Sequence, residues 1–348
     1  MKRSSIYNFF GLLLAVYGLT ACENQDQDFD NYDYQTVYFG NQYPVRTLEL
    51  GEDQEVDLTL DNQKRIEIKA NVGGLRSNNR DIIIDYRIDN ALCDGLTFGD
   101  DGSDVVALPS THYRLLSDKL YIPSGSFMGG VQVEFTDAFF ADTMSLKRHY
   151  VIPVVMTNIV QGADSILSGQ PQTDNPDRCS GDDWTVSPQD FVLEAVKYVN
   201  CWSGYYLRKG VDKITDNSGV ESTVKREAEY VEKNDVAQIT TRGLNKCSQA
   251  VTIKDASGKD YTFNVIMTFN DADNTCVLSS DSEDVSITGA GNFVSKGEKN
   301  SIGGSDRDAI YLQYTAIINS LGLTYATTDT LIMRNRGVAP EYFTVIRK

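Results

Sequence analysis

Two tryptophans, each beside polar or aromatic residues, are the side chains in this sequence best suited to holding a ligand. One follows two aspartates in a polar stretch, and the other is followed within four positions by two tyrosines. Such rings pack on apolar ring faces like those of sugars, while neighbouring polar groups bond hydroxyls. The candidate ligand-binding residues are Trp184, Trp202, Tyr205 and Tyr206. The alternative is that these rings only pack, Trp184 between domains and Trp202 at the end of a barrel.

Motifs of catalysis are not found. Residues 125–129 resemble the nucleophile elbow G-x-S-x-G, but their serine stands one place too early. His112 and His149 have no neighbouring metal ligands, and chance pairs are common among 49 acidic residues. We expect a protein that is not an enzyme, with no catalytic residues, no cofactor and no metal site.

Acidic turns leave loose calcium binding as an alternative to solvated loops. Residues 271–276 begin like an EF-hand loop, but cysteine replaces its required glycine, which excludes that motif. The remaining clusters are Asp100, Asp101 and Asp104, and Asp281, Glu283 and Asp284.

The first 22 residues have the layout of an export signal. Lys2 and Arg3 precede an apolar run over 9–19, which is too short for the roughly 20 residues of a membrane-spanning helix. The run ends in Leu-Thr-Ala-Cys at 19–22, which resembles the bacterial lipobox. We therefore expect residues 1–21 to be a lipoprotein signal peptide and Cys22 to be the lipid anchor, since several acyl chains hold a protein stably in a membrane.

The residues after Cys22 predict a tether. Residues 23–31 are polar and acidic without periodicity, so they cannot bury enough apolar surface to fold alone, and we expect an acidic tether over 22–35. An acidic cluster directly after an acylated cysteine resembles the surface-export signal of Bacteroidetes lipoproteins. That resemblance implies an outer-membrane protein, lipid-anchored and facing out from the cell surface.

Composition limits the partners. The formal charge is −17, and removal of residues 1–21, which hold Lys2, Arg3 and no acidic residue, makes it −19. Such a surface repels phosphate backbones, so nucleic acid is not an expected partner. A chain of 348 residues predicts about two domains after the signal peptide is removed.

The cysteines after the anchor are odd in number and follow no metal-binding spacing. At least one thiol must stay unpaired, and most are expected to be small buried residues. A bridge from Cys179 to Cys201 is the pairing we expect, because the segment between them reads as a loop, although other pairings stay open. The set is Cys93, Cys179, Cys201, Cys247 and Cys276.

The first half alternates apolar and polar residues in short runs separated by glycine-rich turns. Residues 66–72, 82–88 and 131–135 have this period of two, and 149–156 is a more continuous apolar run that suits a central strand. The pattern predicts an all-β domain over 36–158, an immunoglobulin-like β-sandwich.

A second all-β domain is expected after a polar linker over 159–190. A short helix over 188–198 is an option, because Phe191, Ala195 and Tyr198 would share a face. Residues 191–348 are predicted to form an antiparallel β-barrel or sandwich domain. Its expected strands are 202–208, 222–232, 260–270, 276–280, 285–295, 310–318, 323–333 and 342–346.

The order of lipobox, acidic tether, a sandwich from Val37 to the strand 150–154, and a domain ending in 329–337 resembles a group of two-domain Bacteroidetes surface lipoproteins. Members have an amino-terminal immunoglobulin-like domain of formerly unknown function and a carboxy-terminal antiparallel β domain. They are accessory proteins of polysaccharide utilisation systems, encoded beside a transporter and its glycan-capturing lid. The resemblance rests on framework strands and assigns no binding residue.

The resemblance and the aromatic candidates lead to one expected function. It is a non-catalytic, carbohydrate-binding lipoprotein that binds glycans for an outer-membrane polysaccharide uptake system. Its expected partners are an oligosaccharide or polysaccharide, the outer membrane through the lipid anchor, and a transporter and lid complex. The alternative is a structural or adhesive, fimbria-associated surface lipoprotein.

Overall fold

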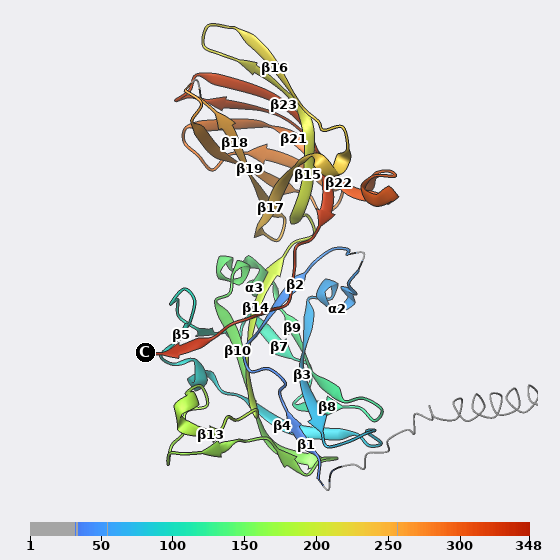
Figure 1. The fold of residues 1–348 in the computed structure, drawn as a ribbon, viewed down its shortest axis with the longest axis vertical. Helices are drawn as coiled ribbons and strands as arrows, with labels where there is room; N and C mark the ends of the chain where they lie inside the picture. The colour runs from blue at the N-terminus through green and yellow to red at the C-terminus, as the bar shows by residue number, and fades with distance from the viewer. Residues whose placement is uncertain (1–31, 33, 54, 256) are drawn as a thin grey trace, which may run out of the picture.

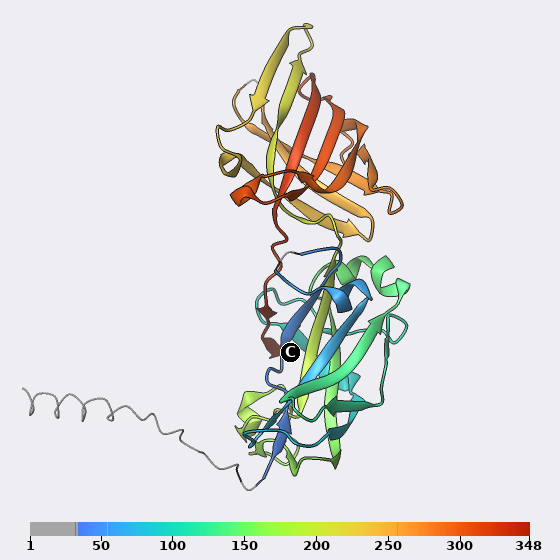
Figure 2. The ribbon, with the colours of Figure 1, turned by 90° about the vertical axis from the view of Figure 1, so that its right-hand side faces the viewer.

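The computed structural model describes residue 32 and residues 34–53, 55–255 and 257–348. They form two β-rich domains stacked end to end, joined by a narrow waist (Figures 1 and 2). The predicted all-β fold class is confirmed. Among the described residues, no helix is both long and apolar enough to cross a membrane. The expected signal peptide, Cys22 and most of the tether lie outside the described residues.

The first domain is a sheet that wraps around a hydrophobic core, and twelve strands are described in it. The order of its main path is β11-β1-β3-β9-β8-β4-β10-β14-β2-β24, with β6 paired to β10 and β7 to β9. The bounds are β1 Thr36–Tyr38, β2 Pro44–Glu49, β3 Arg65–Gly73, β4 Ile82–Ile88, β6 Val106–Ala107, β7 Tyr113–Leu115, β8 Lys119–Ile122, β9 Met128–Phe135, β10 Tyr150–Gln161, β11 Ser165–Ile166, β14 Phe191–Val199 and β24 Glu341–Tyr342.

Two small strand pairings, two short α-helices and three 3-10 helices are also described in this domain. Strand β5 (Leu96–Phe98) pairs with β25 (Val345–Arg347), and β12 (Gln170–Pro171) pairs with β13 (Trp184–Val186). The α-helices are α2 (Thr59–Asn62) and α3 (Asp137–Ala141).

Strands β10 and β14 lie at the centre of the first domain and are buried on both faces. Ile152 and Val154 face the main core, whereas Val151 and Val155 face a second apolar cluster with Phe98. The predicted central strand over 149–156 is therefore present. Burial on both faces explains why its sequence is a continuous apolar run, without visible alternation.

The chain divides between the domains differently from the prediction. Residues 191–199 form β14 rather than a helix, and this strand pairs with β10 and β2 of the first domain. The same two-sided burial hides the period of two in this stretch and lets it pass for a helical pattern. The chain end also returns to the first domain, where Phe343 is buried in the second cluster. The second domain therefore spans only about residues 204–335.

Residues 159–190 are not a free linker. Strand β10 continues to Gln161, β11 pairs with β1, and the β12–β13 hairpin packs on the flank of the same domain. The polar composition reflects edge strands and surface turns, which need little apolar surface of their own.

The second domain is a closed antiparallel barrel of eight strands in the described chain, which settles the predicted choice between barrel and sandwich. Consecutive strands pair from β17 to β23, β15 pairs with both β17 and β23, and β16 extends β15 outside the closed ring. The bounds are β15 Gly204–Thr215, β16 Glu221–Arg226, β17 Asp235–Gly243, β18 Lys246–Lys254, β19 Asp260–Phe269, β20 Thr275–Ser279, β21 Val285–Glu298, β22 Arg307–Ile318 and β23 Leu323–Asn335.

Arg336 holds the waist between the domains. Its guanidinium donates to the carbonyl oxygens of Asn200 and Cys201, where the chain first passes from the first domain to the barrel. It also donates to the carbonyl oxygen of Leu50 in the first domain. It also pairs with Glu49 at 3.2 Å, with both side chains 5% exposed. Burial raises the pKa of Glu49, an effect that the charge of Arg336 opposes. The side chain of Arg336 therefore connects both segments that join the domains, at residues 200–201 and at 336, to the first domain.

Candidate functional site

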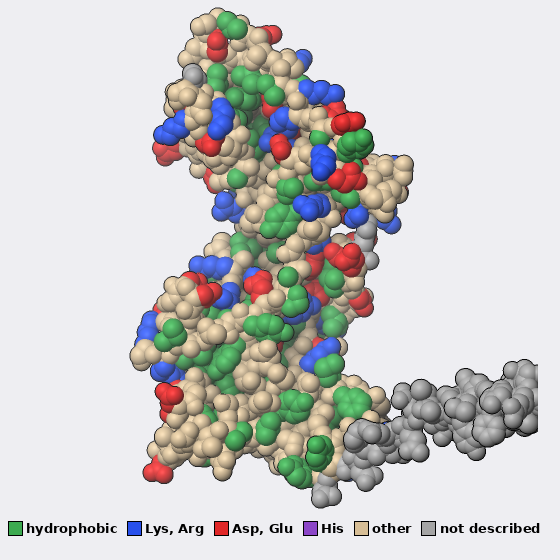
Figure 3. Space-filling view, viewed as in Figure 1, with side chains coloured by type: hydrophobic (Ala, Val, Ile, Leu, Met, Phe, Trp, Pro, Cys, Tyr) green, Lys and Arg blue, Asp and Glu red, His purple; other side chains and the backbone are tan. Residues whose placement is uncertain are grey.

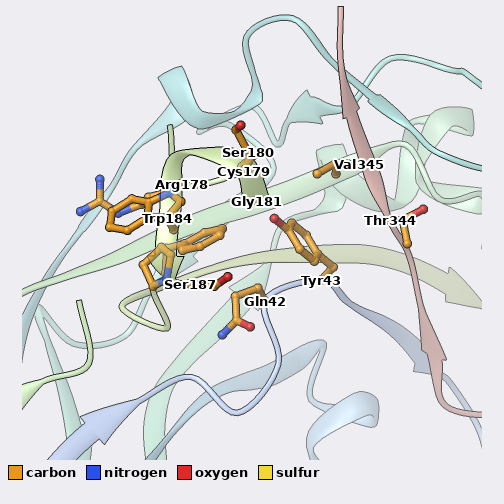
Figure 4. Close-up of a pocket in the computed structure, with 12 residues that line it drawn as sticks. Gln42, Tyr43, Arg178, Cys179, Ser180, Gly181, Trp184, Ser187, Thr344 and Val345 are labelled. Atoms are coloured by element: carbon orange, nitrogen blue, oxygen red, sulfur yellow. The ribbon is translucent and has the colours of Figure 1, made fainter. Parts of the chain in front are cut away.

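A pocket of about 370 Å³ opens on the side of the first domain (Figure 4). Three segments that are distant in the sequence form it: the turn before β2, the stretch 178–191, and the returning chain end at β25. We call it the Trp184 pocket, and its lining residues are Gln42, Tyr43, Arg178, Cys179, Ser180, Gly181, Trp184, Ser187, Pro188, Phe191, Thr344 and Val345.

Trp184 is a fixed wall of this pocket. It begins β13, and its indole Nε1 donates to the carbonyl oxygen of Asp177 at 2.7 Å. The side chain of Asp183 accepts from the backbone N–H of Asp177 at 2.7 Å, which closes the turn that presents the ring. Because Trp184 is 9% exposed, only a small part of the ring meets the pocket.

Tyr43 lies across the pocket from Trp184 in Figure 4. Its ring packs edge-on against Phe191 and Phe343, with centroids 6.0 and 5.5 Å apart. Burial, together with the neighbouring Cys179, raises the pKa of the Tyr43 hydroxyl well above its ordinary value. The hydroxyl is therefore a neutral hydrogen-bonding group in the pocket.

Arg178 brings a charge to the site that is already balanced. Its guanidinium donates two hydrogen bonds to Asp190, at 3.1 and 2.9 Å, and Asp190 is buried. A bidentate pair of this kind is geometrically specific and fixes the guanidinium. The pocket therefore combines aromatic walls with amide, hydroxyl and guanidinium groups. The positive charge of Arg178 is neutralised by Asp190.

The predicted ligand residues are separated by the structure. Trp202 is 2% exposed and stacks on Phe269 inside the barrel, with ring centroids 4.2 Å apart. Tyr206 is fully buried and donates its hydroxyl to the carbonyl oxygen of Trp202 at 2.7 Å. These two side chains are buried in the barrel core and offer no stacking face, so their prediction as ligand-binding residues is wrong.

Tyr205 lies apart from both tryptophans. It is half-buried at the waist, beside a hollow of about 160 Å³, and its ring fills the space where a side chain on Gly337 would stand. Gly337 has a φ of +72°, so glycine is required there for two reasons. Of the four candidates, only Trp184 lines the pocket described above.

The sequence did not identify most of the pocket. Gln42 and Tyr43 precede β2, Ser187 follows β13, and Thr344 lies near the chain end. The pairing of β2 with β14 and the hydrogen bond from Leu193 N–H to the carbonyl oxygen of Gln42 bring the first two segments together, and the return of residues 338–348 adds Thr344. No local spacing signals this convergence.

The described cysteines are all free, so the expected bridge from Cys179 to Cys201 is absent. Cys179 packs in the second cluster of the first domain, whereas Cys201 packs against the barrel core. Burial raises the pKa of Cys179 and of Cys201 to about 11 each. Thiols in this state are weak nucleophiles.

The acidic turns considered for calcium have protein partners. Asp100 accepts from Arg148, Asp104 pairs with Lys348, and Asp284 accepts from Tyr261 and Ser320. Within the described residues, no group of three or more His, Cys, Asp or Glu side chains lies close enough to hold a metal ion.

A second hollow of about 520 Å³ lies on the outside of the barrel, over β15, β21, β22 and β23. It is larger than the Trp184 pocket, but its single aromatic lining residue, Tyr314, is buried. Its exposed side chains are mostly polar and include Lys213, Thr288, Gln313 and Thr328. This surface offers hydroxyls without an aromatic wall.

Comparisons with known proteins identify two family models and a relative that covers most of the chain. A model described as a domain of unknown function (DUF5627) matches residues 201–337, and one described as an N-terminal domain matches 30–161. A search of curated proteins gives no match. A solved Bacteroides ovatus protein of unknown function is 46% identical, covers 91% of this chain and 100% of its own, and superposes with a TM-score of 0.86.

More distant structures are similar only in part. Another Bacteroides ovatus protein of unknown function is 14% identical, with 89% of this chain and 99% of its own covered and a TM-score of 0.43. A Bacteroides thetaiotaomicron protein described as an auxiliary nutrient binding protein is 12% identical, with 83% and 90% covered and a TM-score of 0.35. Neither is close enough to assign a function. The 46% identity over the whole of that solved chain is decisive: the protein belongs to the family of this Bacteroides ovatus protein of unknown function, and the DUF5627 model matches its barrel.

Proposed function

We propose that the protein binds a short uncharged glycan in the Trp184 pocket and does not cleave it. The observation that carries this proposal is that Trp184 and Tyr43 lie on opposite sides of one pocket. The polar side chains of Gln42, Ser187 and Thr344 also line it. A sugar presents apolar C–H faces and hydroxyls together, which this mixture of groups matches.

The size and charge of the pocket favour a small neutral ligand. Its volume of about 370 Å³ lies near the lower end of ordinary ligand pockets, which run from ~300 to ~1,000 Å³. Because Asp190 balances Arg178, a charged substituent on the sugar is not needed for binding. Affinity should be weak, in the range from about micromolar to millimolar, and should depend little on salt.

We further propose that the protein reaches its ligand as a lipoprotein on the outer membrane, anchored through Cys22. The support is the sequence at 19–22 and the charged start before it. In this proposal the glycan is passed to an uptake complex of a transporter and its glycan-capturing lid. Replacement by Cys22→Ala should abolish palmitate labelling and membrane association, and labelling that persists in this variant would contradict the anchor.

Calorimetric titration with a panel of neutral plant, microbial and host oligosaccharides tests the binding proposal. Wild-type protein should bind at least one of them, and Trp184→Ala should weaken that binding by tenfold or more, equivalent to about 1.4 kcal/mol. Trp202→Phe is the matched control, because that position has no exposed face. Absence of binding to every glycan would favour an adhesive role, and release of shorter sugars would show an enzyme.

A further inference from the structure

The end of the first domain where the described chain begins carries exposed aromatic and apolar side chains. Figure 3 shows hydrophobic side chains gathered at this end of the molecule. We call this group the end patch, and its members, which are 44% to 77% exposed, are Tyr32, Tyr34, Tyr121, Phe127 and Met128.

Backbone contacts make the end patch one surface. The N–H of Tyr32 donates to the carbonyl oxygen of Gly74, just after β3, at 3.2 Å. Phe127, just before β9, lies next to β3, because the carbonyl oxygen of Phe127 accepts a hydrogen bond from the backbone N–H of Val72 at 3.0 Å. Met128 and Tyr121 stand in β9 and β8, which pair with each other. The patch therefore lies on and beside three neighbouring strands, β3, β9 and β8.

Two polar groups in and beside the end patch, the Tyr121 hydroxyl and the Arg80 guanidinium, form hydrogen bonds within the protein. The hydroxyl of Tyr121 bonds to Asp81, which raises the pKa of that tyrosine. Arg80 bonds to the side chain of Gln35. Tyrosine rings, which have an apolar body and a polar tip, suit the boundary between water and lipid, where tyrosine is enriched.

The position of the anchor supplies the occupant. Cys22 stands ten positions before Tyr32, and ten residues span at most ~35 Å however they are arranged. The barrel lies at the opposite end of the molecule from β1, near which the described chain begins (Figure 1). A lipid-linked Cys22 would therefore hold the end patch near the bilayer and leave the barrel farthest from it.

We infer that the end patch rests on the surface of the bilayer and orients the protein there, with the rings in the headgroup region. This inference depends on the proposed anchor at Cys22. Apolar faces of surface-bound elements enter the boundary between headgroups and acyl chains by ~5–10 Å, which is within reach of exposed side chains on a strand end.

Fluorescence quenching by brominated lipids tests the contact. The acylated full chain is reconstituted in phosphatidylcholine vesicles, and Phe127→Trp is compared with Val277→Trp, whose position on barrel strand β20 is 66% exposed. The emission added at Phe127→Trp should shift to the blue and be quenched by lipids brominated near the headgroup. The emission added at Val277→Trp should do neither. Met128→Trp repeats the test at a second patch position, and circular dichroism checks the fold of each variant.

Each other outcome contradicts the inference in a distinguishable way. If the protein floats with the vesicles but neither patch variant is quenched, the anchor stands and the lipid contact is wrong; a protein partner would then be the occupant to seek. Equal quenching at Phe127→Trp and Val277→Trp would mean that the molecule has no preferred orientation. If wild type does not float, the anchor itself fails, and the patch inference fails with it.

Discussion

The two domains use the chain in opposite ways. In the barrel consecutive strands pair from β17 to β23, β15 pairs with β17, and one long-range pairing, β15 with β23, closes the ring. In the first domain β2 lies beside β14, and β5 pairs with β25 near the chain end. The barrel is therefore complete within its own segment, whereas the first domain is complete only when the chain returns to it. The Trp184 pocket lies in the domain assembled from distant segments, and its shape depends on that return.

Deletion of residues 338–348 should have the largest effect and separates the domains. It removes β24, β25 and the buried ring of Phe343, and replacing one such ring by alanine already costs about 3–5 kcal/mol. We expect the unfolding transition of the first domain to fall steeply in scanning calorimetry while the barrel transition stays in place. Tyr342→Ala, at a position 63% exposed, is the control and should change little. A lowered barrel transition with an unchanged first domain would reverse the comparison.

The two tryptophans should differ in what they affect. Trp202→Ala removes a ring stacked in the barrel core and should lower the free energy of unfolding of the barrel by about 3–5 kcal/mol. Trp184→Ala should cost less stability, because the ring lies at a pocket wall, but should weaken ligand binding. Urea unfolding and calorimetric titration of both variants measure the contrast. Equal loss of binding in both would indicate that the pocket is not the site.

Substitution at the waist tests whether the domains act on one another. Arg336→Met leaves Glu49 buried without its partner and should lower the free energy of unfolding by about 3 kcal/mol. The double variant with Glu49→Gln should recover part of that loss, because no unpaired carboxylate then remains. Urea unfolding of the two single variants and the double variant gives the coupling. Additive losses would show that the pair contributes nothing beyond its separate contacts.

The pH dependence should have opposite signs in the two domains. In the first domain, burial raises the pKa of Glu194 to about 8, against the charge of Arg46, from an ordinary value of 4.5. Its protonated form is favoured in the fold, so stability should decrease as pH rises from 4.5 to 8, by roughly 2 kcal/mol given its partial exposure. In the barrel, burial would raise the pKa of Asp212, but hydrogen bonds from Arg226 and Thr327 outweigh it and lower the pKa below 3.8. That contribution should be present above pH 3.8 and be lost as pH falls further.

Thermal unfolding of wild type and Glu194→Gln from pH 3 to 9 measures this difference. In the variant, the first-domain transition should lose its decrease toward pH 8, while the barrel transition should be unchanged. A decrease that persists in Glu194→Gln would assign it to another group.

The sequence predicted strands where large apolar residues alternate with exposed ones, and it missed strands where that alternation is weaker or absent. The alternation of Ile310, Leu312 and Tyr314 predicted β22 because one face of a barrel strand is buried and the other is wet. Strands β17 and β18 were not predicted, since the inward positions of β17 include the small Ala237 and the polar Thr241. Period-two patterns fail where inward residues are not large and apolar, and they fail again at β14, where both faces are buried.

Of the residues that line the Trp184 pocket, the sequence predicted only Trp184 as a ligand-binding residue. Trp184 stood out because a large ring in a polar stretch has no evident core of its own. Its neighbours across the pocket, Tyr43 and Thr344, come from opposite ends of the chain, and only long-range strand pairing brings them together. Trp202 was a candidate on a different local signal, the two tyrosines that follow it, and is a core residue. Residue type alone did not separate a pocket wall from a core ring.

Filling the pocket is the most direct test of glycan binding. Gly181 lines the Trp184 pocket, and a Cβ added there would meet no atom within 4 Å, so we expect the backbone to accept Gly181→Leu and the leucine to take up part of the pocket. Thr288→Leu fills the outer hollow of the barrel in the same way and is the matched control. In calorimetric titration with the best-binding oligosaccharide, Gly181→Leu should lose affinity by tenfold or more, about 1.4 kcal/mol, while Thr288→Leu binds like wild type. Unchanged binding in Gly181→Leu, with loss in Thr288→Leu, would move the site to the barrel and contradict the account.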